Sequence, residues 1–208
     1  MRIADGLNVE AALFQARTED EIVINTNAGG RSTYQNSGRT ERRGAELSVD
    51  YLFASNWRLQ VAYTYLEATY SDAYETCTAI PCNAANPQNK ATVAAGNRLP
   101  GIPENNVYTA IRWNSDFGLY ASVNFQHLSD IMVNDLNNRT PAPAYEVFGL
   151  DVGYRLELAA LLIDSFVRVN NATDEDYVGS IIVNDGNNRF YEPGTGAAVL
   201  GGITVRWR

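Results

Sequence analysis

The segment Ala198–Arg208 reads A-V-L-G-G-I-T-V-R-W-R, and its last six residues alternate between apolar and polar side chains. Successive side chains of a β-strand point to opposite faces, so Ile203, Val205 and Trp207 share one face. Thr204, Arg206 and Arg208 share the other. A strand of this kind separates an apolar environment from a wet one, as a strand in the wall of a membrane barrel does.

The same period-two pattern recurs along the chain and predicts about eight strands long enough to cross a bilayer. The clearest example is 57–65, where Trp57, Leu59, Val61, Tyr63 and Tyr65 alternate with Arg58, Gln60, Ala62 and Thr64. The pattern places the first strand at about 7–24, the second from about 33 to 53, and the seventh at about 163–177.

Composition narrows the class of protein. The 208 residues are 45% hydrophobic and 19% charged, and 12 Tyr, 7 Phe and 16 Gly form a β-rich set of residues. A net charge of −8 without a basic stripe excludes nucleic acid as a partner. No apolar run reaches the roughly 20 residues that a membrane-spanning helix requires.

The predicted connections alternate in length. Those near Ala54, Ser115 and Ala159 are short, whereas those near residues 28, 74, 133 and 184 are longer or more polar. Short turns on one side and long loops on the other are typical of outer-membrane barrels. A soluble β-sandwich remains an alternative, because its solvent face also carries charges of both signs. The aromatic strand ends favour an all-β, antiparallel transmembrane β-barrel. These ends are Tyr51, Trp57, Tyr65, Trp113, Tyr120, Tyr154 and Trp207.

Two cysteines, Cys77 and Cys82, stand close together in C-T-A-I-P-C within a long loop rich in Pro and Asn, at about 72–104. This spacing favours a small disulfide-closed loop in an oxidising compartment. Two independent thiols or a pair of metal ligands are the alternatives. No third ligand stands nearby, so we predict the disulfide and no metal site.

Several segments resemble, in the right order, the barrel of TonB-dependent outer-membrane receptors of Gram-negative bacteria. The resemblance rests on Glu21–Val23 with Tyr34–Gly38, on Gly44–Leu47 (G-A-E-L), on Tyr63–Ala68 (Y-T-Y-L-E-A), on Asn97–Pro103 (N-R-L-P-G-I-P) and on Val169–Tyr177 (V-N-N-A-T-D-E-D-Y). Each motif alone is weak, but together they cover nearly the whole chain. The loop at about 179–193 most resembles receptors of the ferric-siderophore or ferric-citrate type.

This resemblance implies a partial barrel. Barrels of the family have about 22 strands, so residues 1–208 would supply the C-terminal eight or so. The plug domain, the N-terminal strands and the peptide that contacts TonB would be absent from this chain. Such barrels usually end in an aromatic residue, whereas here Arg208 follows Trp207. The resemblance also implies an outer-membrane location, lipid contact and an interaction with TonB only through the missing N-terminal region.

The expected function is that of a receptor fragment for the energised uptake of a ferric chelate or similar nutrient. Ligand contacts are expected from the long loops, where guanidinium groups bind oxyanions and aromatic rings stack on planar groups. The candidates are Arg31, Tyr34, Tyr74, Arg98, Arg139, Arg189 and Tyr191. A small self-closed barrel with a structural or adhesive role is the alternative from another class.

The sequence predicts no enzyme and no cofactor. His127 is the only histidine, and with Ser129 it would share a strand face without forming a catalytic triad. Asp174–Asp176 lacks the spacing of a calcium-binding EF-hand loop and is read as a solvated strand end.

Overall fold

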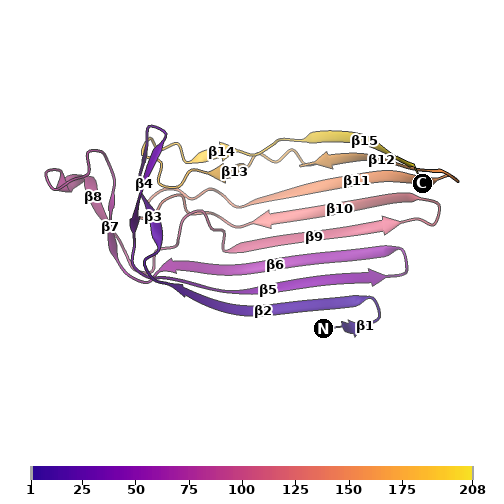
Figure 1. Ribbon diagram of the computed structural model, residues 1–208, viewed down its shortest axis with the longest axis horizontal. Coiled ribbons are helices and arrows are strands. Elements are labelled where there is room, and N and C mark those ends of the chain that lie inside the picture. The colour runs from indigo at the N-terminus through magenta and orange to yellow at the C-terminus, as the bar shows by residue number, and fades with distance from the viewer. Residues whose placement is uncertain (1, 208) are drawn as a thin grey trace.

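A computed structural model describes residues 2–207 of the protein. Its main element is a nine-stranded sheet in which every strand pairs antiparallel with its neighbours (Figure 1). In spatial order the strands are β1 (Arg2–Ala4), β2 (Leu7–Thr18), β5 (Thr40–Phe53), β6 (Trp57–Tyr70), β9 (Asn105–Asn114), β10 (Leu119–Leu128), β11 (Tyr145–Glu157), β12 (Leu161–Asn170) and β15 (Ala198–Trp207). Within the described residues the sheet is open, with β1–β2 at one edge and β15 at the other.

The eight longer strands are the predicted ones, and each has 10 to 14 residues. A tilted strand of about 9–11 residues crosses a bilayer. The short turns all lie at one end of the sheet, together with β1 and the last residues of β15 (Figure 1). The long connections all lie at the opposite end, as the sequence indicates. Among residues 2–207, no helix is long and apolar enough to cross a membrane.

Three small hairpins stand at this loop end (Figure 1). They are β3 (Ile22–Ala28) with β4 (Arg31–Asn36), β7 (Tyr74–Cys77) with β8 (Lys90–Val93), and β13 (Val178–Ile181) with β14 (Tyr191–Pro193). A 3-10 turn, η1 (Pro87–Asn89), precedes β8. The long connections are therefore partly ordered structures.

The expected limits of the first, second and seventh strands were too long. The second strand was expected from about residue 33, but residues 31–36 form β4 of a separate hairpin and β5 begins only at Thr40. β2 ends at Thr18 because Asp20 has a left-handed backbone, with φ 54°. Two hydrogen bonds between Glu21 and residues 37 and 38 then close the base of the β3–β4 hairpin. β12 ends at Asn170 because Asn171, with φ 47°, turns the chain and binds Glu175 through its side-chain amide.

Strand register gathers the apolar residues onto one face. Val61 stands opposite Val49 on one side and Thr109 on the other, and Val123 stands between Ile111 and Leu150. At the short-turn end, the rings of Phe53, Trp57 and Trp113 follow one another at centroid distances of 6.2 and 6.4 Å. This row is an aromatic girdle of the kind that marks a membrane interface.

The apolar face ends abruptly toward the loops. Beyond Tyr65, the positions on this same face of the sheet are occupied by charged residues. Arg43 Nη2 lies 2.8 Å from Glu67 Oε1. Arg17 pairs in the same way with Glu41 at 3.1 Å. The apolar band therefore covers only the part of the sheet between the aromatic girdle and these ion pairs. Charged side chains are costly in hydrocarbon, so the ion pairs mark the end of the band.

The opposite face is polar and pairs its charges across strands. Arg155 Nη2 lies 3.0 Å from Asp164 Oδ2, and Tyr120 donates a 2.8 Å hydrogen bond to the same carboxylate. Arg58 binds Asp50 and Arg168 binds Asp151 on this face as well. Tyr120, which the sequence grouped with the aromatic strand ends, thus faces the polar side. Arg208, assigned to this face with Arg206, lies outside the described residues.

The apolar face is left uncovered by the described chain. Val205 is 59% exposed and Trp207 80% exposed, and within residues 2–207 no second sheet packs over this face. A β-sandwich would bury these side chains between two sheets. An exposed apolar band of this kind is typical of the outer face of a membrane barrel, which favours the membrane barrel over the soluble sandwich.

Candidate ligand site at the loop end

The buried core of the described chain lies among the loops. One cluster contains Val23, Ala68, Tyr70, Val93 and Leu99, and a second contains Val133, Ala142 and Phe190. The first cluster joins two of the small hairpins, through β3 and β8, to the end of β6 and the connection before β9. The second joins the β10–β11 loop to the last loop. Burial of these side chains stabilises the loops as one packed cap at the end of the sheet.

A buried carboxylate ties the cap together. Asp135, 2% exposed, accepts a 2.7 Å hydrogen bond from the Tyr70 hydroxyl and a 2.6 Å bond from the Asn184 amide. Asn184 also donates to the Ile24 carbonyl at 3.2 Å, and Asn97 donates to the Asp135 carbonyl at 2.9 Å. We call these residues the Asp135 hub. They link all four long connections.

The first and last long loops touch although about 160 residues separate them. The Gly186 amide donates a 2.7 Å hydrogen bond to the Asn27 carbonyl, and the Asn27 side chain donates to the Val183 carbonyl at 3.1 Å. Farther along the last loop, Tyr191 donates a 2.5 Å bond to the Thr140 carbonyl. Three loops that carry predicted ligand residues are therefore in contact.

Two of the predicted ligand residues are engaged within the protein. Arg98 lies 2.9 Å from Asp130 and 3.3 Å from Glu104, and its side chain is only 18% exposed. The ring of Tyr74 packs on Tyr70 at 5.1 Å, and burial raises the pKa of the Tyr74 hydroxyl. Both side chains hold loops in place.

The other five predicted residues face solvent. Tyr34 is 65% exposed and Tyr191 43% exposed. Arg31, Arg139 and Arg189 are exposed, and among the described residues no side chain neutralises their guanidinium groups. Because Gly186 contacts Asn27 and Tyr191 contacts Thr140, these arginines lie on three contacting loops. We call them the arginine triplet.

Two ion pairs at the base of the cap are not predicted by the sequence pattern. Arg42 binds Glu21 at 3.0 Å, and this hydrogen bond lowers the pKa of Glu21. Arg39 binds Asp72 at 2.8 Å and lowers the pKa of that carboxyl to about 2. The Asp135 hub was missed as well. Its only sequence signal is a carboxylate within the apolar run I-M-V-N-D-L.

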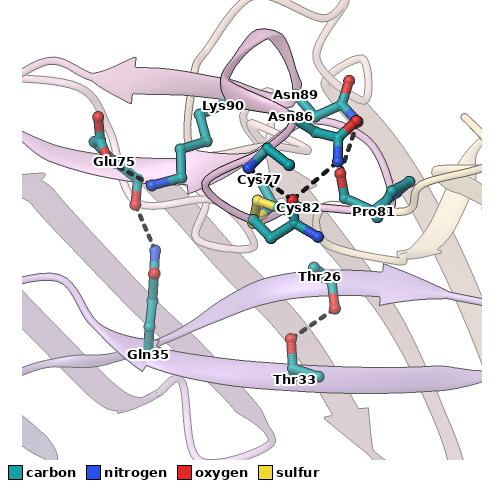
Figure 2. The surroundings of a disulfide bond; sticks show 12 residues. Thr26, Thr33, Gln35, Glu75, Cys77, Pro81, Cys82, Asn86, Asn89 and Lys90 are labelled. Atoms are coloured by element: carbon teal, nitrogen blue, oxygen red, sulfur yellow. Dashed lines mark hydrogen bonds and ion pairs between the residues drawn. A yellow bond between two sulfur atoms is a disulfide. The ribbon is translucent and has the colours of Figure 1, made fainter.

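Cys77 and Cys82 are joined, with an S–S distance of 1.99 Å (Figure 2). The disulfide closes the far end of the β7–β8 hairpin, and Asn89 donates a 2.8 Å hydrogen bond to the Pro81 carbonyl inside this loop. Gln35 donates to the Glu75 carbonyl at 2.7 Å, which links β4 to β7. Lys90 is neutralised by Glu75 at 2.9 Å.

No catalytic or metal-binding role is predicted for His127, Ser129 and Asp174, and each of them contacts a different partner. Nδ1 of His127 lies 3.4 Å from Oε1 of Glu146, whereas Ser129 Oγ accepts a 3.0 Å hydrogen bond from the Asn105 amide. Asp174 accepts a 2.8 Å bond from the Ala197 amide. Among the described residues, no group of three or more His, Cys, Asp and Glu side chains has the arrangement of a metal site.

An apolar band with an aromatic girdle, a polar opposite face and loops gathered at one end together define a wall of an antiparallel membrane β-barrel. The chain belongs to the TonB-dependent receptor-like β-barrel family, whose model matches residues 3–172. Members of this family are outer-membrane receptors and transporters, not enzymes, and they include a ferric-catecholate import receptor.

Relatives and solved structures agree with this assignment. The chain is 25% identical over 174 residues to the probable TonB-dependent siderophore receptor PiuA of Acinetobacter baumannii, covering 82% of this chain and 21% of that protein. It is 26% identical over 152 residues to the ferrioxamine B receptor of Salmonella typhimurium, covering 71% and 19%. The chain thus spans about a fifth of the length of these relatives.

The fold matches those of complete receptors. The crystal structure of PiuA from Acinetobacter baumannii superimposes with a TM-score of 0.72 at 18% identity, covering 97% of this chain and 26% of that one. The unliganded ferric citrate transporter FecA gives 0.71 at 17% identity, covering 97% and 29%. At these identities the likeness shows the fold.

Proposed function

We propose that the chain is part of an outer-membrane receptor of a Gram-negative bacterium that takes up a ferric chelate. Family membership supports this function, as do relatives whose names denote siderophore and ferrioxamine B receptors. The observation that carries it here is the arginine triplet, because exposed, unneutralised guanidinium groups on contacting loops attract an anionic chelate.

The open sheet supports a partial barrel. Unpaired backbone groups at β2 and β15 would each cost several kcal/mol in lipid, so further strands must cover both edges. We propose that residues 1–208 form the C-terminal portion of a larger barrel, whose plug and N-terminal strands belong to the rest of the receptor. Contact with TonB would then occur through that other part. The small self-closed barrel is not favoured, because the described strands do not close on themselves.

We propose that the ligand contacts Arg31, Arg139 and Arg189, with Tyr34 and Tyr191 available for stacking on its planar parts. Arg98 and Tyr74 would act by holding the loops that present these residues.

Uptake of a radiolabelled ferric chelate by iron-limited cells tests the function. Deleting the gene should abolish uptake of at least one chelate, and restoring the full-length gene should recover it. Arg139→Ala and Arg189→Ala should each weaken chelate binding about fivefold or more, since one charge-assisted hydrogen bond contributes on the order of 1 kcal/mol at an exposed site.

Lys90→Ala is the matched control. It removes one positive charge from the same end of the molecule, but Glu75 already neutralises that charge. Its chelate affinity should therefore stay unchanged. Equal losses in Lys90→Ala and the triplet variants would show a diffuse charge effect, and unchanged uptake of every chelate after gene deletion would refute the function.

A further inference from the structure

A pocket of about 400 Å³ opens between the start of β11 and the β13–β14 hairpin. Three tyrosines line it, together with Pro193, Gly194 and Asp176. The tyrosines are Tyr145, Tyr177 and Tyr191. Its volume falls within the range of small-ligand sites.

Local backbone structure fixes the rings. The rings of Tyr145 and Tyr177 lie 4.5 Å apart, and Gly194 donates a 2.7 Å hydrogen bond to the Tyr177 carbonyl. A Cβ atom on Gly194 would stand 2.3 Å from the Tyr177 ring, so this ring position requires glycine. Tyr191 is held by its hydrogen bond to Thr140. The aromatic walls are therefore preorganised.

The pocket carries one uncompensated charge. Asp176 is exposed, and among the described residues no arginine, lysine or histidine forms an ion pair with it. No lysine or arginine lines the pocket either. A single carboxylate is too few ligands for a hard metal ion, which takes six or more oxygens. An anion would be repelled.

We propose that this pocket binds the ammonium group of an organic amine. Tyrosine faces attract a cation through the negative charge of their π-system, and a carboxylate beside them adds an ion pair. The inference rests on the proposed uptake function and narrows its substrate class to chelates that carry a protonated amine. Since Tyr191 contacts Thr140, the amine would bind beside Arg139, which would hold an anionic part of the same ligand.

The test uses the full-length gene product in detergent and n-butylammonium as the probe, followed by saturation-transfer NMR. n-Butanol is the neutral control of similar size. Butylammonium should bind at least fivefold more tightly than butanol, and Asp176→Asn should remove this preference. Asp116→Asn, which removes an exposed carboxylate from a turn at the opposite end, should leave the preference unchanged.

A second pair of variants separates the ring from its hydroxyl group. Tyr177→Phe keeps the aromatic face and should bind butylammonium as the natural protein does, whereas Tyr177→Leu should lose binding fivefold or more. Equal binding of butylammonium and butanol, or unchanged selectivity in Asp176→Asn, would overturn the proposal. Failure of the probe to bind while ferric-chelate uptake persists would refute only the amine site. Probe binding without uptake of any ferric chelate would refute the uptake function instead.

Discussion

Replacing Val61 by arginine should destabilise the protein in a bilayer, whereas replacing its neighbour Gln60 by arginine should not. Val61 lies on the apolar face between Val49 and Thr109, and Gln60 points to the polar face opposite Asp50. The two variants add the same charge at one height of one strand. Only the face differs.

The expected cost follows from the position of Val61 along β6. The apolar stretch runs from Trp57 to Tyr65, eight residue steps that span about 27 Å along the strand. A tilt of about 40° reduces this to about 21 Å across the membrane. Val61 is four residues from either end and therefore lies near the midplane, where an arginine costs about 2–4 kcal/mol. The folding equilibrium should fall about 30- to 900-fold.

The measurement is the urea midpoint of the full-length gene product folded into lipid bilayers. Val61→Arg should lower the midpoint, Gln60→Arg should leave it nearly unchanged, and Tyr65→Arg should cost only about 0–1 kcal/mol because it lies at the interface. Equal costs for the two neighbours, or no dependence on depth, would refute the assignment of the apolar face to lipid.

Three further predictions concern the loop end. Asp135→Ala removes the acceptor of the buried Tyr70 hydroxyl and of one N–H of the half-buried Asn184 amide, at a cost of about 3 kcal/mol. The Gly186 amide should therefore exchange its hydrogen about 100-fold faster, and unchanged exchange would refute the hub. Reduction of the Cys77–Cys82 disulfide should lower the stability of the β7–β8 hairpin by about 2 kcal/mol. Protease should then cleave this hairpin while the nine-stranded sheet stays intact. Cleavage that begins in the sheet would contradict this expectation. The pKa of Asp72 lies at about 2 beside Arg39, so this ion pair should persist at pH 4 and open as the pH falls through about 2. The chemical shift of the Arg39 amide reports this opening, which should vanish in Asp72→Asn; a midpoint near pH 4 would contradict the lowered pKa.

The sequence by itself determined the strands of the main sheet and which face of each strand is apolar. Side chains alternate along a strand, so the pattern in 57–65 identified both the strand and its faces without knowledge of any partner. The lengths of the connections likewise predicted which end carries the loops. Strand ends were less accurate, because the turns at Asp20 and Asn171 depend on backbone conformations that period-two alternation does not report.

Only the tertiary structure separated the predicted site residues that are exposed from those that are engaged within the protein. Residue type and loop position pointed equally to Arg98 and Arg139, but Arg98 is neutralised by Asp130 and Glu104 while Arg139 stays exposed. The Asp135 hub and the tyrosine-lined pocket that contains Asp176 both join segments that lie far apart in the chain. Such contacts follow from how whole hairpins pack at the end of the sheet, and no local periodicity encodes them.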